Sequence, residues 1–274
     1  MDLGQGQRET HTMPRFAANL TMLFNEVDFL DRFEAAAKAG FKGVEYLFPY
    51  DYPAAELKAR LDAFDLTQVV HNVPCGDWSA GERGIACLPD RVDEFRAGVD
   101  SAIQYATALG CRQLNCLVGI APQGVDEAVL RATVVDNLAY TAAALKAADI
   151  RLLIEPVNTR DIPGFYLCHT DQAFDIISET GSDNIALQYD IYHMQIMQGD
   201  LARTLEANIA RIEHIQLADN PGRHEPGTGE INYPFLFDLI DRIGYRGWIG
   251  CEYKPAATTV EGLGWAAGYL EPGR

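Results

Sequence analysis

From residue 15 onward the chain alternates between short apolar runs and longer stretches whose apolar residues recur at helical spacing. The short runs are rich in β-branched and aromatic side chains, whereas the longer stretches are rich in Ala, Leu and Glu. The runs, which predict strands, lie at 16–20, 43–47, 66–70, 113–117, 151–154, 185–189, 212–217 and 248–252. The stretches, which predict helices, lie at 28–39, 54–64, 90–109, 125–147, 171–180, 200–209, 233–243 and 260–269.

Eight strand-then-helix units in about 255 residues predict one (β/α)8 TIM barrel, a fold of the α/β class. A doubly wound open sheet is the alternative, but no Gly-x-Gly-x-x-Gly motif follows the first strand, so its dinucleotide-binding form loses support. Residues 1–13 carry no periodicity and are expected to form a flexible N-terminal tail. No low-complexity linker divides residues 14–274, which we therefore interpret as one barrel domain.

The charge of the chain narrows the classes of partner. Its 274 residues include 39 acidic and 22 basic side chains, for a formal net charge of −17, whereas binding a nucleic-acid backbone requires a basic surface. No apolar run approaches the roughly 18 residues of a membrane-spanning helix, and the polar N-terminus lacks the apolar core of a signal peptide. Six cysteines without a Cys-x-x-Cys pair indicate reduced thiols. We expect a cytoplasmic protein that binds neither nucleic acid nor membrane.

Four successive strands end in side chains that can bind metals or protons, and in a parallel barrel the active site forms at these ends. The strands RLLIEPV, NIALQYD, IEHIQLAD and GWIGCEY present Glu155, Asp190, Gln216 and Glu252. An exposed rim carboxylate or an ion-pair partner would explain one such residue, but four successive strand ends favour a constellation. Because a buried carboxylate is costly unless it is paired, three carboxylates and an amide predict a divalent cation, Mg²⁺ or Mn²⁺ rather than Zn²⁺.

Other polar side chains lie in loops beside these strand ends. His193 lies in the loop YDIYHMQ and can point over the metal toward a ligand; a histidine bonded to a backbone carbonyl is the alternative. The loop DNPGRHEPGTGE carries Arg223, whose guanidinium suits bidentate capture of a carboxylate, with a solvated loop arginine as the alternative. The segment 76–86, GDWSAGERGIA, carries Trp78 and Arg83 and is long enough to act as a lid.

The remaining histidines and the common catalytic motifs add little. His71 at the end of the third strand is a further candidate, with a packed histidine as the alternative, whereas His169 and His214 are interpreted as wall or core. A serine nucleophile elbow, a phosphate-binding loop and a paired Cys-His arrangement are all absent from the sequence. The strand-end constellation therefore carries the chemistry.

Over nearly its whole length the chain resembles the hydroxypyruvate isomerase family, within the xylose isomerase-like barrel superfamily. The segments EPVNTRDIPGFYL, DIYHMQ and PGRHEPGTGEINY carry the most specific part of this resemblance. The metal positions that it implies are the four strand-end residues, and the substrate contacts that it implies are His193, Arg223 and Asp161. Related sugar epimerases place a histidine where this chain has Gln216, and this departure, typical of the hydroxypyruvate branch, is expected to weaken metal binding.

The resemblance implies an aldose–ketose isomerase that interconverts hydroxypyruvate and 2-hydroxy-3-oxopropanoate. Such a reaction needs a base beside a carbonyl, a group that delivers a proton to the neighbouring carbon, and stabilisation of the enediolate between them. Glu155 and Glu252 are the expected pair, and a divalent metal would take up the developing charge. Arg223 or another basic group would hold the substrate carboxylate. Barrels of this superfamily are often dimers or tetramers, so a homo-oligomer is also expected.

Several alternative activities use the same scaffold. Members of the family also isomerise 2-oxotetronate to its 3-oxo partner. A ketose 3-epimerase would use the same two carboxylates, although Gln216 and the arginine-bearing loop favour an acid substrate over a neutral sugar. A metal-dependent phosphodiesterase, as in some repair endonucleases, would need several histidines at its site and a basic surface, whereas this chain has six histidines and a charge of −17. A non-catalytic sugar-binding protein would not need two carboxylates beside its ligand.

Overall fold

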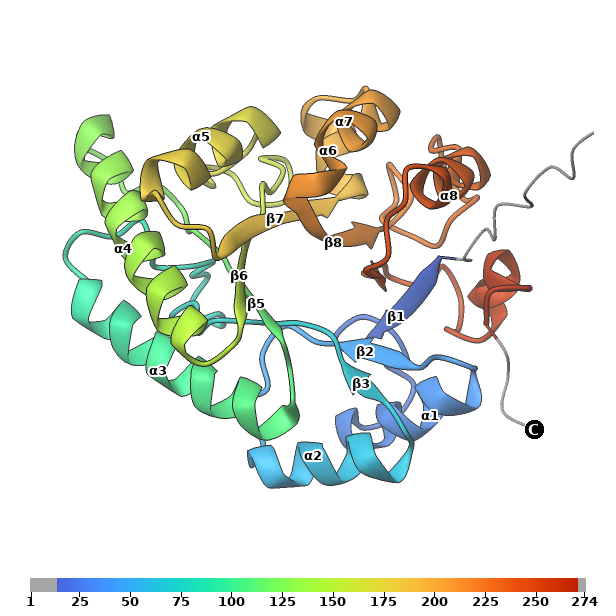
Figure 1. Cartoon of the computed structure of the whole chain (residues 1–274). Helices are drawn as coiled ribbons and strands as arrows, with labels where there is room; N and C mark the ends of the chain where they lie inside the picture. Colours follow the sequence, from blue (N-terminus) through green and yellow to red (C-terminus); the bar gives the residue numbers. More distant parts are fainter. Residues whose placement is uncertain (1–13, 271–274) are drawn as a thin grey trace, which may run out of the picture.

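The strands of the computed structural model, which describes residues 14–270, lie parallel in one sheet (Figure 1). Their order is β3-β2-β1-β9-β8-β7-β6-β5-β4. Their bounds are β1 (Arg15–Asn19), β2 (Gly43–Glu45), β3 (Thr67–Gln68), β4 (His71–Asn72), β5 (Gln113–Cys116), β6 (Arg151–Ile154), β7 (Ile185–Asp190), β8 (Ile212–Leu217) and β9 (Trp248–Cys251). Apart from β4, each strand begins within one residue of a predicted run. The tail expected at 1–13 lies outside the described residues.

The two outermost strands in this order, β3 and β4, belong to one extended segment, and this segment closes the sheet into a barrel. β3 pairs with β2, and β4 pairs with β5. Between them the Val69 amide donates to the Val44 carbonyl oxygen at 2.8 Å, and just beyond them the Val73 amide donates to that of Asn115 at 2.9 Å. The third predicted strand is thus shared between two neighbours, and the predicted (β/α)8 TIM barrel is confirmed.

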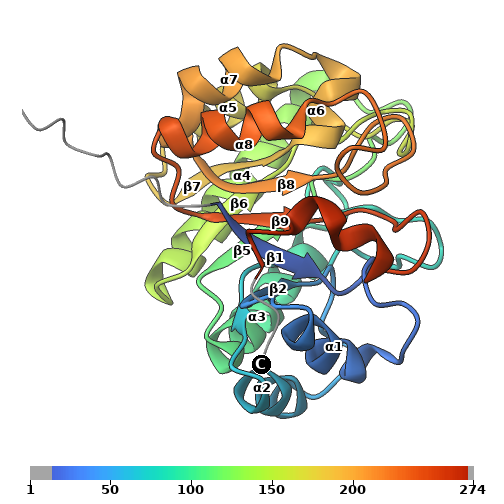
Figure 2. The same ribbon diagram turned by 90° about the vertical axis from the view of Figure 1, so that its right-hand side faces the viewer.

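Helices surround the barrel, as the two views show (Figures 1 and 2). The α-helices are α1 (Arg32–Lys38), α2 (Ala54–Ala63), α3 (Val92–Leu109), α4 (Glu127–Ala147), α5 (Thr170–Thr180), α6 (Ile191–Met197), α7 (Leu201–Asn208) and α8 (Tyr233–Arg242). The helix predicted at 260–269 is wrong in type: only the 3-10 helix η3 (Glu261–Ala266) forms there, in a stretch with three glycines. The prediction of a loop after β7 is also wrong, because α6 begins directly after this strand. The Asp190 carboxylate accepts from the Tyr192 amide and caps this helix.

Apolar side chains pack on both faces of the barrel wall. The larger core lies between the sheet and the surrounding helices. Inside the barrel, toward the N-terminal ends of the strands, lies a small buried cluster of Ala17, Val69, Val70, Leu153 and Ala186. Trp248 packs against this cluster, and the Arg15 guanidinium lies 3.9 Å from the centroid of its ring. Above this floor the interior is filled by buried polar side chains, which belong to the site described next.

The structure bears on two features considered in the sequence analysis, membrane-spanning helices and the state of the cysteines. Within residues 14–270 the structure contains no helix with the length and apolar character needed to cross a bilayer. All six cysteines are free and buried, as expected of reduced thiols. Burial raises the pKa of the Cys116 thiol to about 12, so this thiol stays protonated and unreactive at neutral pH.

Candidate active site

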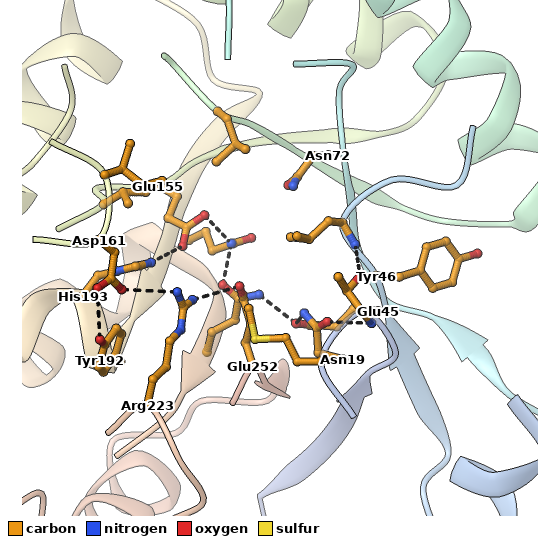
Figure 3. Close-up of a pocket in the computed structure, with 18 of the residues that line it drawn as sticks. Asn19, Glu45, Tyr46, Asn72, Glu155, Asp161, Tyr192, His193, Arg223 and Glu252 are labelled. Atoms are coloured by element: carbon orange, nitrogen blue, oxygen red, sulfur yellow. Dashed lines mark hydrogen bonds and ion pairs between the residues drawn. The ribbon is translucent and has the colours of Figure 1, made fainter. Parts of the chain in front are cut away.

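A cavity of about 660 Å³ opens at the carboxyl ends of the strands (Figure 3). Six of the seven predicted site residues line it, namely Glu155, Gln216 and Glu252 at strand ends and Asp161, His193 and Arg223 in the segments that follow. The seventh, Asp190, is fully buried in its wall, within 4 Å of two of the others. The structure therefore brings all the predicted residues to one place.

Glu155 directly follows β6 and is buried. Its Oε2 accepts from Asn115 Nδ2 and from Gln188 Nε2, both at 2.9 Å. Its Oε1 receives no hydrogen bond from the residues that the structure describes and lies 3.9 Å from His193 Nε2. Burial, together with repulsion from Glu252 and a further carboxylate, raises the pKa of Glu155 well above its ordinary value. One oxygen of this side chain is thus anchored, and the other is free to meet a ligand.

Glu252 follows β9, three places from β6 in the sheet order. Its Oε1 accepts from Arg223 Nη2 at 3.0 Å. Burial raises the pKa of Glu252 above its ordinary value, and the positive charge of Arg223 offsets only part of this rise. Two buried carboxyl groups with raised pKa values therefore line one cavity. Carboxyl groups with raised pKa values are suited to general acid–base chemistry.

Asp190 ends β7, and its two oxygens have different surroundings. Oδ1 accepts from the Tyr192 amide at 2.8 Å. Oδ2 is buried and has no hydrogen-bond partner among the described residues. It lies 3.5 Å from His193 Nε2 and 3.8 Å from Arg223 Nη2. Because buried carboxylate oxygens are normally satisfied, this atom fits a cation or a donor supplied by a ligand.

His193 lies in the first turn of α6 rather than in the expected loop, and hydrogen bonds fix its tautomer. Asn158 Oδ1 accepts from the amides of Arg160 and Asp161, so its Nδ2 is the group that faces His193 Nδ1 at 2.6 Å. Burial, and then the charge of Arg223, lower the pKa of His193 well below its ordinary value, so the ring is neutral. Nδ1 accepts and Nε2 carries the hydrogen. The ring therefore presents an N–H toward the carboxylates.

Arg223 places its guanidinium among carboxylates, as Figure 3 shows. Besides its bond to Glu252, its Nη2 lies 3.8 Å from Asp190, and its Nη1 lies 3.5 Å from Asp161 Oδ2. Burial alone would lower the pKa of Arg223, but the carboxylates outweigh burial and hold this pKa above its ordinary value. Its side chain is only 16% exposed. The alternative of a solvated loop arginine is therefore wrong.

A further buried carboxylate, which the sequence analysis did not single out, lies inside the barrel. Glu45 ends β2 and accepts from Gln216 Nε2 at 2.7 Å, from His214 Nε2 at 2.8 Å and from Asn19 Nδ2 at 3.0 Å. Gln216 Oε1 in turn accepts from Gln188 Nε2 at 2.6 Å. His214, interpreted as wall or core, is thus the partner of a buried carboxylate. The signal was present, because the strand GVEYL also carries a carboxylate near its end.

Part of the predicted metal set is available to a divalent cation. Glu155, Asp190 and His193 offer ligand atoms that all lie within 4.8 Å of one another. The partnerless Oδ2 of Asp190 and the free Oε1 of Glu155 are hard oxygen donors, which Mg²⁺ and Mn²⁺ prefer. His193 meets them with an N–H, which suits a ligand oxygen rather than a metal. The two carboxylates thus fit a cation as they stand.

The other two predicted metal ligands have protein partners. Gln216 Oε1 accepts from Gln188, and Glu252 Oε1 accepts from Arg223. Gln216 Oε1 would exchange its present donor for the cation on binding, whereas Glu252 Oε2 receives no hydrogen bond from the described residues and could bind a cation directly. The residues therefore fit a metal, with a competing hydrogen bond at Gln216.

Three more residues from the sequence analysis can be placed. His71 is buried, neither of its ring nitrogens has a partner in the described part of the chain, and burial lowers its pKa to about 3. It is buried and neutral, as the packed alternative predicts, but it also lines the cavity, so its role as a further site candidate stays a prediction. Trp78 and Arg83 line the cavity from the segment 76–86.

The sequence is similar to a known protein family and to named proteins. Residues 33–269 match the family described as xylose isomerase-like TIM barrel. A protein of Escherichia coli (strain K12) named hydroxypyruvate isomerase is 56% identical over 257 residues, which cover 94% of this chain and 100% of the relative. A Cupriavidus necator protein named 2-oxo-tetronate isomerase is 52% identical over 258 residues, covering 94% and 99%.

Solved structures show the same likeness. A structure from Brucella melitensis, described as an AP endonuclease, family 2, is 48% identical, with a TM-score of 0.92 over 94% of this chain and 100% of the other. An L-ribulose 3-epimerase, at 24% identity and a TM-score of 0.71 over 93% and 86%, shares the fold. The chain therefore belongs to the xylose isomerase-like TIM barrel family, together with the hydroxypyruvate isomerase and 2-oxo-tetronate isomerase relatives.

Proposed function

We propose that this protein is an isomerase that interconverts hydroxypyruvate and 2-hydroxy-3-oxopropanoate. The observation that carries the proposal is the pair of Glu155 and Glu252, which are buried, line one cavity and have raised pKa values. The 56% identity to a relative named hydroxypyruvate isomerase supports the choice of substrate. The small-molecule substrate is part of this proposal, whereas the expected homo-oligomer and cytoplasmic location stay predictions.

The reaction transfers a proton between adjacent carbons. One glutamate, in its ionised form, removes a proton from C3 of hydroxypyruvate, and the released electron pair forms the C2–C3 double bond of an enediolate. The other glutamate, in its protonated form, delivers a proton to C2. The C3 hydroxyl proton passes to the C2 oxygen, C3 becomes the aldehyde, and the two glutamates recover their starting states by exchanging a proton with water. Repulsion between buried carboxylates favours this singly protonated pair.

Three further side chains are proposed to bind the substrate. His193 is suited to donate from Nε2 to a substrate oxygen, because its tautomer places the hydrogen there and its ring is held by Asn158. Arg223 lies beside Glu252 and can donate to an oxygen that gains charge in the enediolate. Asp161, which lines the cavity 3.5 Å from the Arg223 guanidinium, is proposed to contact the substrate beside that group.

A divalent cation, Mg²⁺ or Mn²⁺, belongs to the same proposal. Glu155, Asp190, Gln216 and Glu252 would hold it, and the partnerless Oδ2 of Asp190 supports this assignment. When bound, such an ion supplies Lewis-acid stabilisation of the substrate oxygens. We expect weak binding, because Gln216 offers a neutral amide oxygen that is already bonded to Gln188.

Isomerisation of 2-oxotetronate to 3-oxotetronate is the second candidate function. It is favoured by the 52% identity to the relative named 2-oxo-tetronate isomerase. The chemistry is the same, with one more CHOH unit in the substrate, and a cavity of about 660 Å³ has room for either acid. Both candidates therefore use the same two glutamates.

Phosphodiester hydrolysis has less support, although one similar structure is described as an AP endonuclease. The net charge of −17 opposes the approach of a nucleic-acid backbone. Among the described residues, the group with metal-ligand spacing contains a single histidine, His193. This is not the multi-histidine cluster that the alternative would need.

Proton NMR of the purified protein with hydroxypyruvate in D2O tests the proposal. We expect signals of the aldehyde hydrate, with deuterium at C2, and no conversion by the heat-denatured protein. Loss of turnover in EDTA that Mg²⁺ or Mn²⁺ restores would support the metal, and unchanged turnover in EDTA would remove it from the proposal. Conversion of 2-oxotetronate alone would establish the second candidate, and conversion of neither acid would contradict the isomerase.

A further inference from the structure

We propose that Arg83 binds the carboxylate of the 2-oxo acid substrate through the Nε–Nη2 edge of its guanidinium. This inference rests on the proposed function, since it assigns the anionic end of that substrate. The cavity has three cationic side chains in its lining, which are Arg83, Arg223 and Lys254. The three differ in how much of their charge and hydrogen-bonding capacity is still available to a ligand.

Arg223 is poorly suited to bind the substrate carboxylate in addition to the enediolate oxygen, because three carboxylates already surround its guanidinium. Carboxylate oxygens of Glu252, Asp161 and Asp190 lie 3.0, 3.5 and 3.8 Å from its guanidinium nitrogens. A substrate carboxylate bound there would be repelled by all three. Lys254 is exposed, and its ammonium makes no ion pair within residues 14–270. It offers a mobile point charge rather than a fixed fork.

Arg83 has no acidic partner within the described residues. Its Nη1 donates to the carbonyl oxygens of Trp78 at 3.0 Å and Glu82 at 2.7 Å. Its guanidinium stacks on the indole of Trp78, with Cζ 3.9 Å from the ring centroid. These contacts fix the plane of the group but use only one nitrogen. Nε and Nη2 therefore keep their donors for a ligand.

Two other arginines of this protein bind both oxygens of a carboxylate through their Nε–Nη2 edge. Arg131 donates from Nε at 3.0 Å and from Nη2 at 2.8 Å to the two oxygens of Glu179. Arg91 donates from the same two atoms at 2.7 and 2.5 Å to Glu94. Two parallel N–H groups match the two oxygens of a carboxylate. The equivalent edge of Arg83 has no such partner in the described part of the chain.

The segment that carries Arg83 is held firmly at both ends. Glu82 forms an ion pair with Arg91, just before α3. Gly84 packs against the strand-end backbone so closely that a Cβ there would lie 2.2 Å from the Leu117 carbonyl oxygen. Trp78 also lies against Phe48, with ring centroids 5.3 Å apart. Because the guanidinium is already positioned, little ordering cost opposes binding of the carboxylate.

The variant R83Q tests this assignment in the full chain. We expect the KM for hydroxypyruvate to rise about tenfold to hundredfold, the effect of losing charge-assisted hydrogen bonds, with kcat within about threefold of wild type. R83K keeps the positive charge but lacks the two parallel N–H donors of the guanidinium, and its KM should lie between those of wild type and R83Q. R96Q is the matched control, because Arg96 lies on α3 over the Tyr140 ring, outside the cavity lining. Its KM should equal that of wild type.

Two inhibitors separate recognition of the carboxylate from a merely structural role of Arg83. Pyruvate carries the 2-oxo acid group, and hydroxyacetone carries the ketol without a carboxylate. We expect R83Q to raise the inhibition constant of pyruvate and to leave that of hydroxyacetone unchanged. An equal rise in both constants, or a KM within twofold of wild type, would overturn the inference. Turnover of the acid by wild type keeps the proposed function intact in either case, whereas an inactive wild type would overturn both.

Discussion

Gln216 donates its side-chain amide to the Glu45 carboxylate at 2.7 Å, and this bond joins the mouth of the barrel to its interior. Gln188 extends the connection, because its Nε2 donates both to Gln216 Oε1 at 2.6 Å and to Glu155 Oε2 at 2.9 Å. A chain of amide groups thus links two buried carboxylates. Glu155 is one of the two proposed proton-transfer groups. Its orientation therefore depends, through these two amide side chains, on Glu45, which is not one of the predicted metal ligands.

Replacing Glu45 with glutamine tests this dependence. The wild-type carboxylate accepts from three side chains, and an amide at this position would turn an NH₂ group toward one of those donors. We expect E45Q to lower the free energy of unfolding by about 3 kcal/mol, measured by urea denaturation. E206Q, the same exchange on an exposed residue of α7, should be neutral. Equal stability of E45Q and wild type would refute the account of the network.

Gly250 in β9 leaves the space that the Glu45 carboxylate fills. A Cβ at this position would lie 2.3 Å from Glu45 Oε2. We expect G250A to lower the free energy of unfolding by about 2 kcal/mol, since overpacking displaces a buried, fully bonded group. Thermal unfolding measures the effect. The control is G264A, where a Cβ would meet nothing within 4 Å and a change of stability near zero is expected.

His71 should make stability depend on pH. Burial lowers its pKa from 6.5 to about 3, so between these values the unfolded chain binds a proton that the folded chain excludes. The free energy of unfolding therefore falls as pH drops through this window. At about 1.4 kcal/mol per pH unit, His71 should cost about 2 kcal/mol by pH 5. Urea denaturation at pH 7 and pH 5 should show a smaller loss in H71Q than in wild type.

The interpretation of His169 as wall or core is wrong, because this residue is exposed; H169Q therefore provides the control, since it removes an imidazole outside the core. If H71Q and wild type lost the same stability between pH 7 and pH 5, His71 would not be held neutral by burial.

The sequence was sufficient for the barrel and for the strand-end residues, for one physical reason. Parallel strands of a barrel present their carboxyl ends on the same side, so residues that follow different strands must converge. Glu155 and Glu252 could be predicted in this way although they lie 97 positions apart in the sequence. The same reasoning with the two-residue strand period would have found Gln188, two positions before Asp190, and Glu45 at the end of β2.

What the sequence could not predict depends on how loops pack. The ion pair of Arg223 with Glu252 requires a particular path of the loop after β8, and no periodicity encodes that path. The tautomer of His193 depends on Asn158, 35 residues earlier in the chain. That Nε and Nη2 of Arg83 have no partner among the described residues follows only from the positions of the surrounding side chains. Pairings of this kind are set by tertiary contacts rather than by local pattern.

The central claim is that Glu155 and Glu252 together transfer the proton between adjacent carbons. Its most direct test is the turnover of hydroxypyruvate, or of 2-oxotetronate if that acid is the substrate, by the variants E155Q and E252Q. Each substitution removes one proton-transfer group while keeping the shape of the side chain, so kcat should fall by about 10²- to 10⁴-fold in each variant. E206Q should retain wild-type turnover. Near wild-type turnover in both E155Q and E252Q would contradict the account.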